Sequence, residues 1–183
     1  MFKLNDKVIY PGHGAALVEE LVEKSLSGQI IQFFKLNFLC KDMTILIPIN
    51  NLENSGVRFP GSQEIIKLAI EEVHKVSGKK LVCFDFTPSG WNRRNKEYQL
   101  KIQRGNIIEI AQVYRDLMIV SQQKELSFGE KKLLEVAEEL LVQEIQLVMN
   151  KDRDFIIQEL QEPLKEYFFH HVLGSQQVSS SAA

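Results

Sequence analysis

The sequence has 183 residues, of which 44% are hydrophobic and 25% charged, so it can bury a core and is not that of a disordered protein. No apolar run approaches the ~20 residues that a membrane span needs, and the first residues lack the features of a signal peptide, so we expect a cytoplasmic protein without membrane contact. The formal net charge of −2 argues against indiscriminate binding to DNA.

The first 48 residues have the pattern of β-strands. Four segments rich in Val, Ile and Phe are joined by short polar connections, at residues 7–10, 15–22, 29–38 and 43–47. The sequence YPGHG at residues 10–14 has two glycines one residue apart, but it links two predicted strands. We therefore interpret it as a turn, not as a phosphate-binding loop, and predict a small antiparallel β-domain.

After Pro48 the hydrophobic period becomes that of helices. Ser62 is predicted to cap a helix that runs to about residue 76, and residues 77–90 are predicted to form a connector in which the apolar run 81–86 packs as a short extended piece. The apolar face of this helix is too broad for an isolated surface helix. It comprises Ile65, Ile66, Leu68, Ala69, Ile70, Val73 and Val76.

Three more helices follow. Two are predicted from about Trp91 to residue 103 and from residue 106 to 121, with a break at Gly105 that implies an antiparallel bundle. The third opens with Ser127 and Glu130, which have the spacing of a capping box, and carries a core-facing stripe of apolar residues to about residue 149.

The last part of the chain is predicted as a helical extension with a disordered tail. Residues 155–169 have a helical pattern, but Pro163 is expected to kink or end the helix, and residues 174–183 have the composition of a disordered segment. The aromatic cluster at 167–169 is expected to dock on the bundle, with an exposed partner-binding patch as the alternative.

These elements predict an α+β fold class with three parts. Residues 1–60 form the antiparallel β-domain, residues 61–150 form an all-α helical bundle, and residues 151–183 form the extension and tail.

No catalytic or metal-binding constellation is evident. Cys40 and Cys83 are far apart and have no ligand or base at a useful spacing, so we predict that both are buried apolar residues. His170 and His171 are adjacent in a polar segment, where a solvated pair is more common than a metal site. We therefore predict no enzyme activity, metal or other cofactor.

The sequence WNRRNKEYQLKIQR at residues 91–104 is the candidate functional stretch. It places the only tryptophan beside five cations and one acid, within residues 61–120, which carry a charge of +3 (10 basic, 7 acidic). Arg93 with Lys96, and Arg94 with Lys101, are near neighbours on a helix and could reach a phosphate backbone together. From the residues alone, two interpretations stay open: an aromatic anchor beside a solvated face, or an apolar wedge with phosphate-binding cations.

Several separated motifs resemble the CarD/CdnL family of bacterial transcription regulators, which bind RNA polymerase and promoter DNA. These are FKLNDKVIYPGHGAALVEELVE, MTILIPINNLENSGVR, WNRRNKEYQLKIQRGNIIEIAQVYRDL and LSFGEKKLLEVAEELLVQEI. Together they cover about residues 2–148. The resemblance implies a Tudor-like β-barrel, also found in transcription-repair coupling factors, whose edge meets the β-subunit lobe of RNA polymerase.

The resemblance also implies site residues. The strand presented to polymerase would comprise Met43, Thr44, Ile45, Leu46, Ile47 and Pro48, and Lys24 matches a position that is basic in the family. Leu46 departs from relatives that have a basic residue there. Trp91 would be the minor-groove wedge, and the predicted DNA-binding cations are Arg93, Arg94, Lys96 and Lys101.

The resulting prediction is a monomeric transcription regulator. It would bind the polymerase β lobe, contact promoter DNA at the upstream edge of the bubble, largely without sequence preference, and stabilise the open complex with Trp91. The alternative is an adaptor that binds polymerase or another protein and does not contact DNA.

Overall fold

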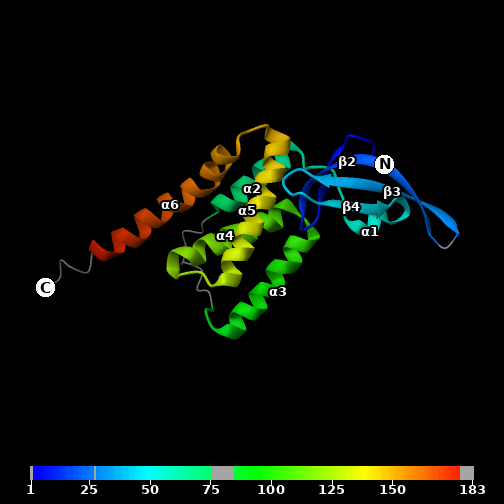
Figure 1. The fold of residues 1–183 in the computed structure, drawn as a ribbon. Coiled ribbons are helices and arrows are strands. Elements are labelled where there is room, and N and C mark those ends of the chain that lie inside the picture. Colours follow the sequence, from blue (N-terminus) through cyan, green and yellow to red (C-terminus); the bar gives the residue numbers. More distant parts are fainter. Residues whose placement is uncertain (1, 27, 76–84, 178–183) are drawn as a thin grey trace.

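The computed structural model describes residues 2–26, 28–75 and 85–177. Four strands at the N-terminus precede a group of helices, which confirms the predicted α+β class (Figure 1). Cys83, most of the predicted connector and residues 178–183 lie outside the described residues. No helix in the described part is long and apolar enough to cross a membrane.

The β-domain is a four-stranded antiparallel half-barrel in which each strand pairs with the next in sequence. The strands are β1 (Lys7–Tyr10), β2 (Gly14–Leu26), β3 (Gln29–Phe38) and β4 (Thr44–Pro48). The chain then turns through η1 (Ile49–Asn51) and α1 (Leu52–Ser55). It returns to the free side of β1, where the Ile9 N–H donates to the Arg58 carbonyl at 2.8 Å.

The core of the β-domain lies on one face of the sheet. On β3, Phe34, Leu36 and Phe38 point into it, as the period of two requires, and β2 is irregular between Val18 and Glu20. The buried set is Val8, Ala16, Val18, Phe34, Leu36, Phe38 and Ile47. β2 is longer than predicted because its last residues pair with the first residues of β3 beyond the end of β4.

The bundle is built around α4, which contacts each of the other long helices. The helices are α2 (Gln63–His74), α3 (Pro88–Arg104), α4 (Ile107–Gln123), α5 (Phe128–Met149) and α6 (Arg153–Gln177). The first half of α6 shares the bundle core, since Ile156, Leu160 and Leu164 are buried with residues of α2, α4 and α5. The bundle predicted from helical periodicity is therefore present.

Predicted helix starts are confirmed where a side chain caps the helix. The Ser62 hydroxyl accepts from the Ile65 N–H, and Ser127 with Glu130 forms a complete capping box. Gly105 ends α3 in the left-handed conformation (φ +69°), in which an L side chain is strained, and a Cβ there would lie 3.0 Å from the Pro11 Cβ, closer than van der Waals contact.

The face of α2 is narrower than predicted. Ile66, Ala69, Ile70 and Val73 are buried, but Ile65 and Leu68 are exposed. The apolar residues of α2 spread around more of the helix than its packing against α4, α5 and α6 covers.

Of the two expectations for Pro163, that it would kink or end the last helix, the second is wrong, because α6 continues to Gln177. Pro163 has no N–H to donate to the Glu159 carbonyl four residues earlier. The His74 side chain of α2 takes that role, with Nε2 2.9 Å from the Glu159 carbonyl oxygen. The predicted disordered tail is thus helical at 174–177, and for His170, His171 and the aromatic residues 167–169 only the backbone is described.

Candidate functional site

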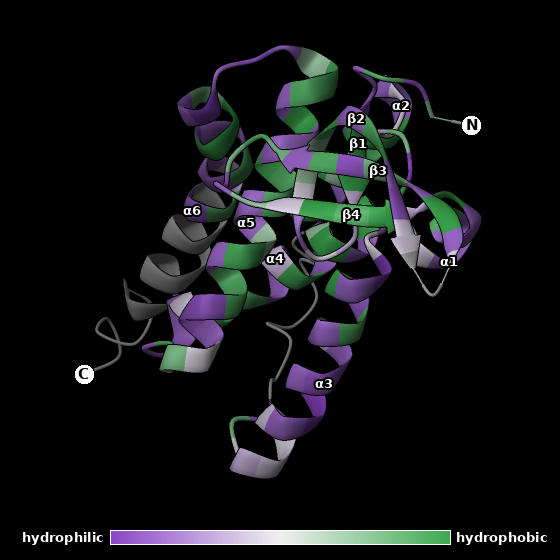
Figure 2. Cartoon of the chain, turned by 45° about the vertical axis from the view of Figure 1, so that its right-hand side comes forward, coloured by the Kyte–Doolittle hydropathy of each residue, from purple (hydrophilic) through white to green (hydrophobic). Residues whose placement is uncertain are grey.

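The α3 tip, residues 88–96, extends beyond α4 and α5 in both Figure 1 and Figure 2. The helix begins three residues before the predicted start because Pro88 fits the first helical position and Thr87 caps it, accepting from the Gly90 N–H at 3.2 Å. The Asp85 carboxylate accepts from the Thr87 N–H at 3.0 Å and from its hydroxyl at 2.6 Å. These bonds hold the pKa of Asp85 below its ordinary value.

Gly90 is required by the same turn. A Cβ there would lie 2.5 Å from the Asp85 carboxyl carbon and 2.6 Å from its backbone oxygen. This turn therefore fixes the position of Trp91 in the first turn of α3.

The sequence left open that Trp91 projects freely from the fold. In the structure it does not. It precedes Tyr98 and Ile102 by about two and three helical turns, so it shares the packed face of α3 with these two buried residues. Its Cζ2 atom lies 3.4 Å from the position that a Cβ would take at Gly129, in the first turn of α5. The indole is partly buried, and its exposed part lies on the protruding end of the helix.

The predicted cations divide into two groups. Arg93 and Lys96 are exposed and make no hydrogen bond or ion pair with any described residue, and they point away from the packed face. The Arg94 side chain donates to the backbone carbonyl of Asp85 and so braces the entry to α3. The Lys101 ammonium is 3.1 Å from Glu97 and 3.2 Å from the Gln112 side-chain oxygen, with its side chain 18% exposed.

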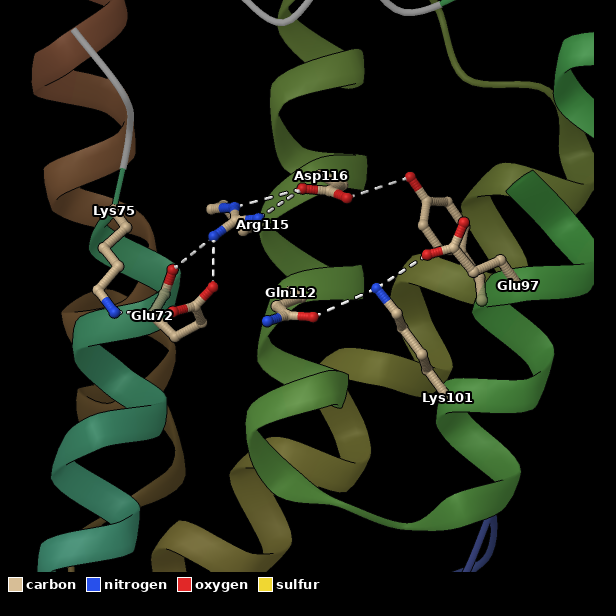
Figure 3. A network of polar contacts seen from close by, with 8 residues as sticks. Glu72, Lys75, Glu97, Lys101, Gln112, Arg115 and Asp116 are labelled. Carbon is tan, nitrogen blue, oxygen red and sulfur yellow. Dashed lines mark hydrogen bonds and ion pairs between the residues drawn. The ribbon is translucent and has the colours of Figure 1, made fainter. Parts of the chain in front are cut away.

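The C-terminal half of α3 is held by a polar network that crosses α4 to α2 (Figure 3). The Tyr98 hydroxyl is 3.4 Å from Asp116, whose other oxygen accepts from Arg115 at 3.0 Å. Arg115 also donates to Glu72 of α2 at 2.7 Å. Burial raises the pKa of Asp116, although Arg115 opposes this. The network anchors α3 behind the tip and leaves the tip itself outside it.

Two aromatic residues near Trp91 were missed by the sequence interpretation. Phe128, next to Gly129, is 84% exposed, and Phe86 is exposed with the Lys124 ammonium 5.8 Å from its ring centre. Helical spacing offered a signal for Phe128, because it lies about half a turn around the helix from the apolar residues Leu133 and Ala137. Lys131 and Lys132 follow it and are also exposed.

The predicted polymerase-binding strand is the edge of the sheet, since β4 pairs with β3 alone among the described strands. Ile47 points into the core, and Met43 and Ile45 pack partly against it. Leu46 lies opposite Lys35 on the outer face, and the register of β2 with β3 puts Lys24 on that same face. Thr44 is exposed and Pro48 partly buried.

The outer face has little free charge near Leu46. Lys35 pairs with Glu19 at 2.9 Å and Glu20 at 3.8 Å, and the bond from Glu19 raises the pKa of Lys35. Lys24 is exposed and makes no ion pair with a described residue. Figure 2 colours most of β4 as hydrophobic, so the edge offers backbone groups and apolar side chains.

Cys40 is exposed, which corrects the prediction that it is buried: it follows the end of β3 in the turn to β4, where the sheet no longer covers it. No three His, Cys, Asp or Glu side chains among the described residues gather as a metal site would require.

Two known family descriptions match the parts of the chain that contain the candidate surfaces. Residues 2–59, which include the β4 edge, match the family described as CarD-like/TRCF RID domain, and residues 85–161, which include the α3 tip, match CarD, C-terminal domain. YdeB of Bacillus subtilis (strain 168), named as a candidate transcription factor, is 31% identical over 148 residues. The aligned region covers 81% of this chain and 92% of YdeB.

Proposed function

The chain belongs to the CarD family of transcription regulators, and from this premise we propose that it binds the β-subunit lobe of RNA polymerase and stabilises the open promoter complex. Residues 1–60 provide the polymerase contact and residues 61–150 the DNA contact. The observation that carries the proposal is the protruding α3 tip, which combines a partly exposed tryptophan with two cations that have no hydrogen-bond or ion-pair partner in the described part.

In this proposal the N-terminal end of α3, and not one side of the helix, faces the DNA. Trp91 lies on the packed face of α3, whereas Arg93 and Lys96 lie on the other side, so one flank of the helix cannot present all three. If the end of the helix enters the minor groove, the indole reaches a base step and the cations reach phosphates beside the groove. Arg94 lies between these directions, and Lys101 is set further back beside Glu97 and Gln112.

The polymerase contact is strand addition at β4. An edge strand has unpaired backbone groups that a partner strand can bond, and the residues that would form it are Met43, Thr44, Ile45, Leu46, Ile47 and Pro48. On the outer face, Leu46 offers an apolar contact at the position where relatives have a basic residue. Lys24 supplies a positive charge on the same face. The contact should therefore depend less on salt than one made by two cations.

The effect on transcription follows from preferential binding. A wedge that fits a distorted step of melted DNA binds the open complex better than the closed one. It shifts the equilibrium between the two complexes only by the difference between its two binding free energies. Non-specific DNA contacts have dissociation constants of roughly 10⁻⁴–10⁻⁶ M. Attachment to polymerase, which gives an effective concentration of about 1 mM, makes so weak a contact sufficient.

The test is the lifetime of promoter complexes formed with purified polymerase and the Trp91→Ala protein. We expect polymerase β-lobe binding to be retained and the added lifetime to be lost. Phe59→Ala is the matched control, because it removes an exposed aromatic residue of the β-domain away from the tip. A Trp91→Ala protein that prolongs the complex as wild type does would refute the wedge.

An adaptor that binds only protein is the second candidate, favoured by the partial burial of Trp91. It is distinguished by binding of the full chain to forked promoter DNA at several salt concentrations. A DNA-binding protein loses affinity steeply as salt rises, whereas an adaptor shows no such binding.

A further inference from the structure

The domain joint connects the β-domain to the bundle through buried polar groups. We define it by Gly14, Ala15, Arg58, Gly61, Gly105, Gln143 and Glu144. Glu144 of α5 is 2% exposed, and its carboxylate accepts from both terminal nitrogens of Arg58, at 2.6 and 2.8 Å. The Gly61 N–H donates to it at 3.0 Å. A buried carboxylate is thus bonded from two directions by the segment that leaves the β-domain.

Arg58 is the central residue of the joint. Its backbone pairs with Ile9 of β1, and its guanidinium reaches both Glu144 and the carbonyl oxygen of Gly105, the latter at 2.6 Å from Nη2 and 3.2 Å from Nε. Gly105 is the C-cap of α3, where exposed carbonyls favour a positive charge. One side chain therefore connects the sheet, α5 and the C-terminal end of α3.

A second contact fixes the joint against rotation. The Ala15 N–H of β2 donates to the Gln143 side-chain oxygen at 2.8 Å, and the Gln143 amide donates to Glu139 at 2.6 Å. Gly14 has φ +99°, where an L side chain is strained, and a Cβ there would lie 2.1 Å from that Gln143 oxygen and displace it from its bond. The YPGHG turn is therefore part of the joint, beyond its role as a turn.

We propose that Arg58 and Glu144 are positioning residues, which set the direction in which the α3 tip points relative to the polymerase-binding edge. The proposal rests on the function proposed above and adds the device that aligns its two contacts. Buried ion pairs contribute little net stability compared with apolar packing, but they favour one geometry over others.

The length of α3 makes the tip sensitive to this geometry. The helix has 17 residues, so the tip lies about 25 Å from the end that Arg58 holds. A rotation of roughly 10° at the joint would move the tip by about 4 Å, which is more than the ~3.4 Å rise between base pairs. Loss of alignment should therefore remove the wedge from its step while each contact surface stays intact.

The test measures the angle and the function in the same full-length proteins. Spin labels are placed at Asn54→Cys in α1 and at Gln99→Cys, an exposed position of α3 outside the tip, with Cys40 and Cys83 changed to Ser, and the distance distribution is recorded. Arg58→Lys is the first variant, because it keeps the charge beside Glu144 but cannot bond Glu144 and Gly105 together. Glu144→Gln is the second, and Tyr114→Phe, which removes a hydrogen bond to Glu138 between α4 and α5, is the matched control.

We expect a narrow distance distribution for wild type and Tyr114→Phe, and a broader or shifted one for Arg58→Lys and Glu144→Gln. The added promoter-complex lifetime should fall at least about fivefold in these two variants, while affinities for the isolated β lobe and for forked DNA stay within about twofold. Unchanged distances would overturn the proposal, and so would changed distances with an unchanged lifetime. If wild type itself bound neither the β lobe nor forked DNA, the proposed function would fail, which is a separate outcome.

Discussion

The domain joint and the α3 tip use charged side chains in opposite ways. At the joint, the buried Glu144 carboxylate and the Arg58 guanidinium are bonded to each other and to backbone groups. At the tip, Arg93 and Lys96 are exposed and have no hydrogen-bond or ion-pair partner in the described part of the chain. Charges that are satisfied internally hold geometry, whereas exposed, unpaired cations remain available to phosphates. Changes at the joint should therefore affect folding, and changes at the tip should affect binding.

The largest expected effect is that of Glu144→Ala on stability. Removing one member of a buried ion pair takes the carboxylate away from Arg58, which keeps only backbone acceptors, and from the Gly61 N–H, at a cost of about 3 kcal/mol. This is the lower end of the usual range because the Arg58 side chain is 31% exposed. Urea unfolding of wild type and variant measures the difference. An unchanged free energy of unfolding would mean that the joint does not hold the domains.

His74→Ala extends the comparison to another internally satisfied group. It should cost about 1–2 kcal/mol, since the Glu159 carbonyl loses its donor and Pro163 cannot replace it. In a Pro163→Ala background the same change should cost less, because the substituted alanine has a backbone N–H for that carbonyl. Thermal unfolding of the four proteins gives the coupling. Equal costs in both backgrounds would show that His74 does not compensate for Pro163.

At the tip, Arg93→Ala with Lys96→Ala should leave stability unchanged and weaken binding to forked DNA by about tenfold at low salt. Each lost phosphate contact should also reduce the slope of log affinity against log salt by about 0.9. Lys101→Ala is the control, because Glu97 and Gln112 already hold its ammonium. A slope reduced equally by Lys101→Ala would break the distinction between free and engaged cations.

The capping box of α5 stabilises the first turn of that helix, against which Trp91 packs. Ser127→Ala should lower the free energy of unfolding by about 1 kcal/mol.

Burial would raise the pKa of Glu130, but bonds from Lys124 and Ser127 outweigh it and hold that pKa below its ordinary value of 4.5. A lowered folded pKa gives stability that is present above pH 4.5 and is lost as pH falls through the folded value. Unfolding at pH 7 and pH 3 should show this loss reduced in Glu130→Gln, and an equal loss would contradict it.

Local signals in the sequence predicted most elements. The alternation of β3, the capping serines Ser62 and Ser127, and the break at Gly105 each act through residues a few positions apart, so they can be recognised without the fold. The start of α3 was misplaced because Gly90 normally opposes a helix. Here Asp85 and Thr87 stabilise the turn in which it lies.

Contacts between distant residues could not be predicted in the same way. Arg58 and Glu144 are 86 positions apart, and no period or motif links them. The side of α3 on which Trp91 lies could be found from its spacing to Tyr98 and Ile102, but only once those two were known to face the core. Lys101 was grouped with the other cations by its charge and its helical spacing to Arg94, and its pairing with Gln112 depends on how α3 packs on α4.

The central claim, that the α3 tip contacts DNA through Trp91, is tested most directly by the fluorescence of that residue. Trp91 is the only tryptophan in the chain, so its emission reports on the tip alone. In a titration with forked promoter DNA, contact with bases should quench the emission, and added salt should reverse the quenching as phosphate contacts weaken. Emission that stays constant up to DNA concentrations of about 1 mM, the effective concentration expected on polymerase, would contradict the claim.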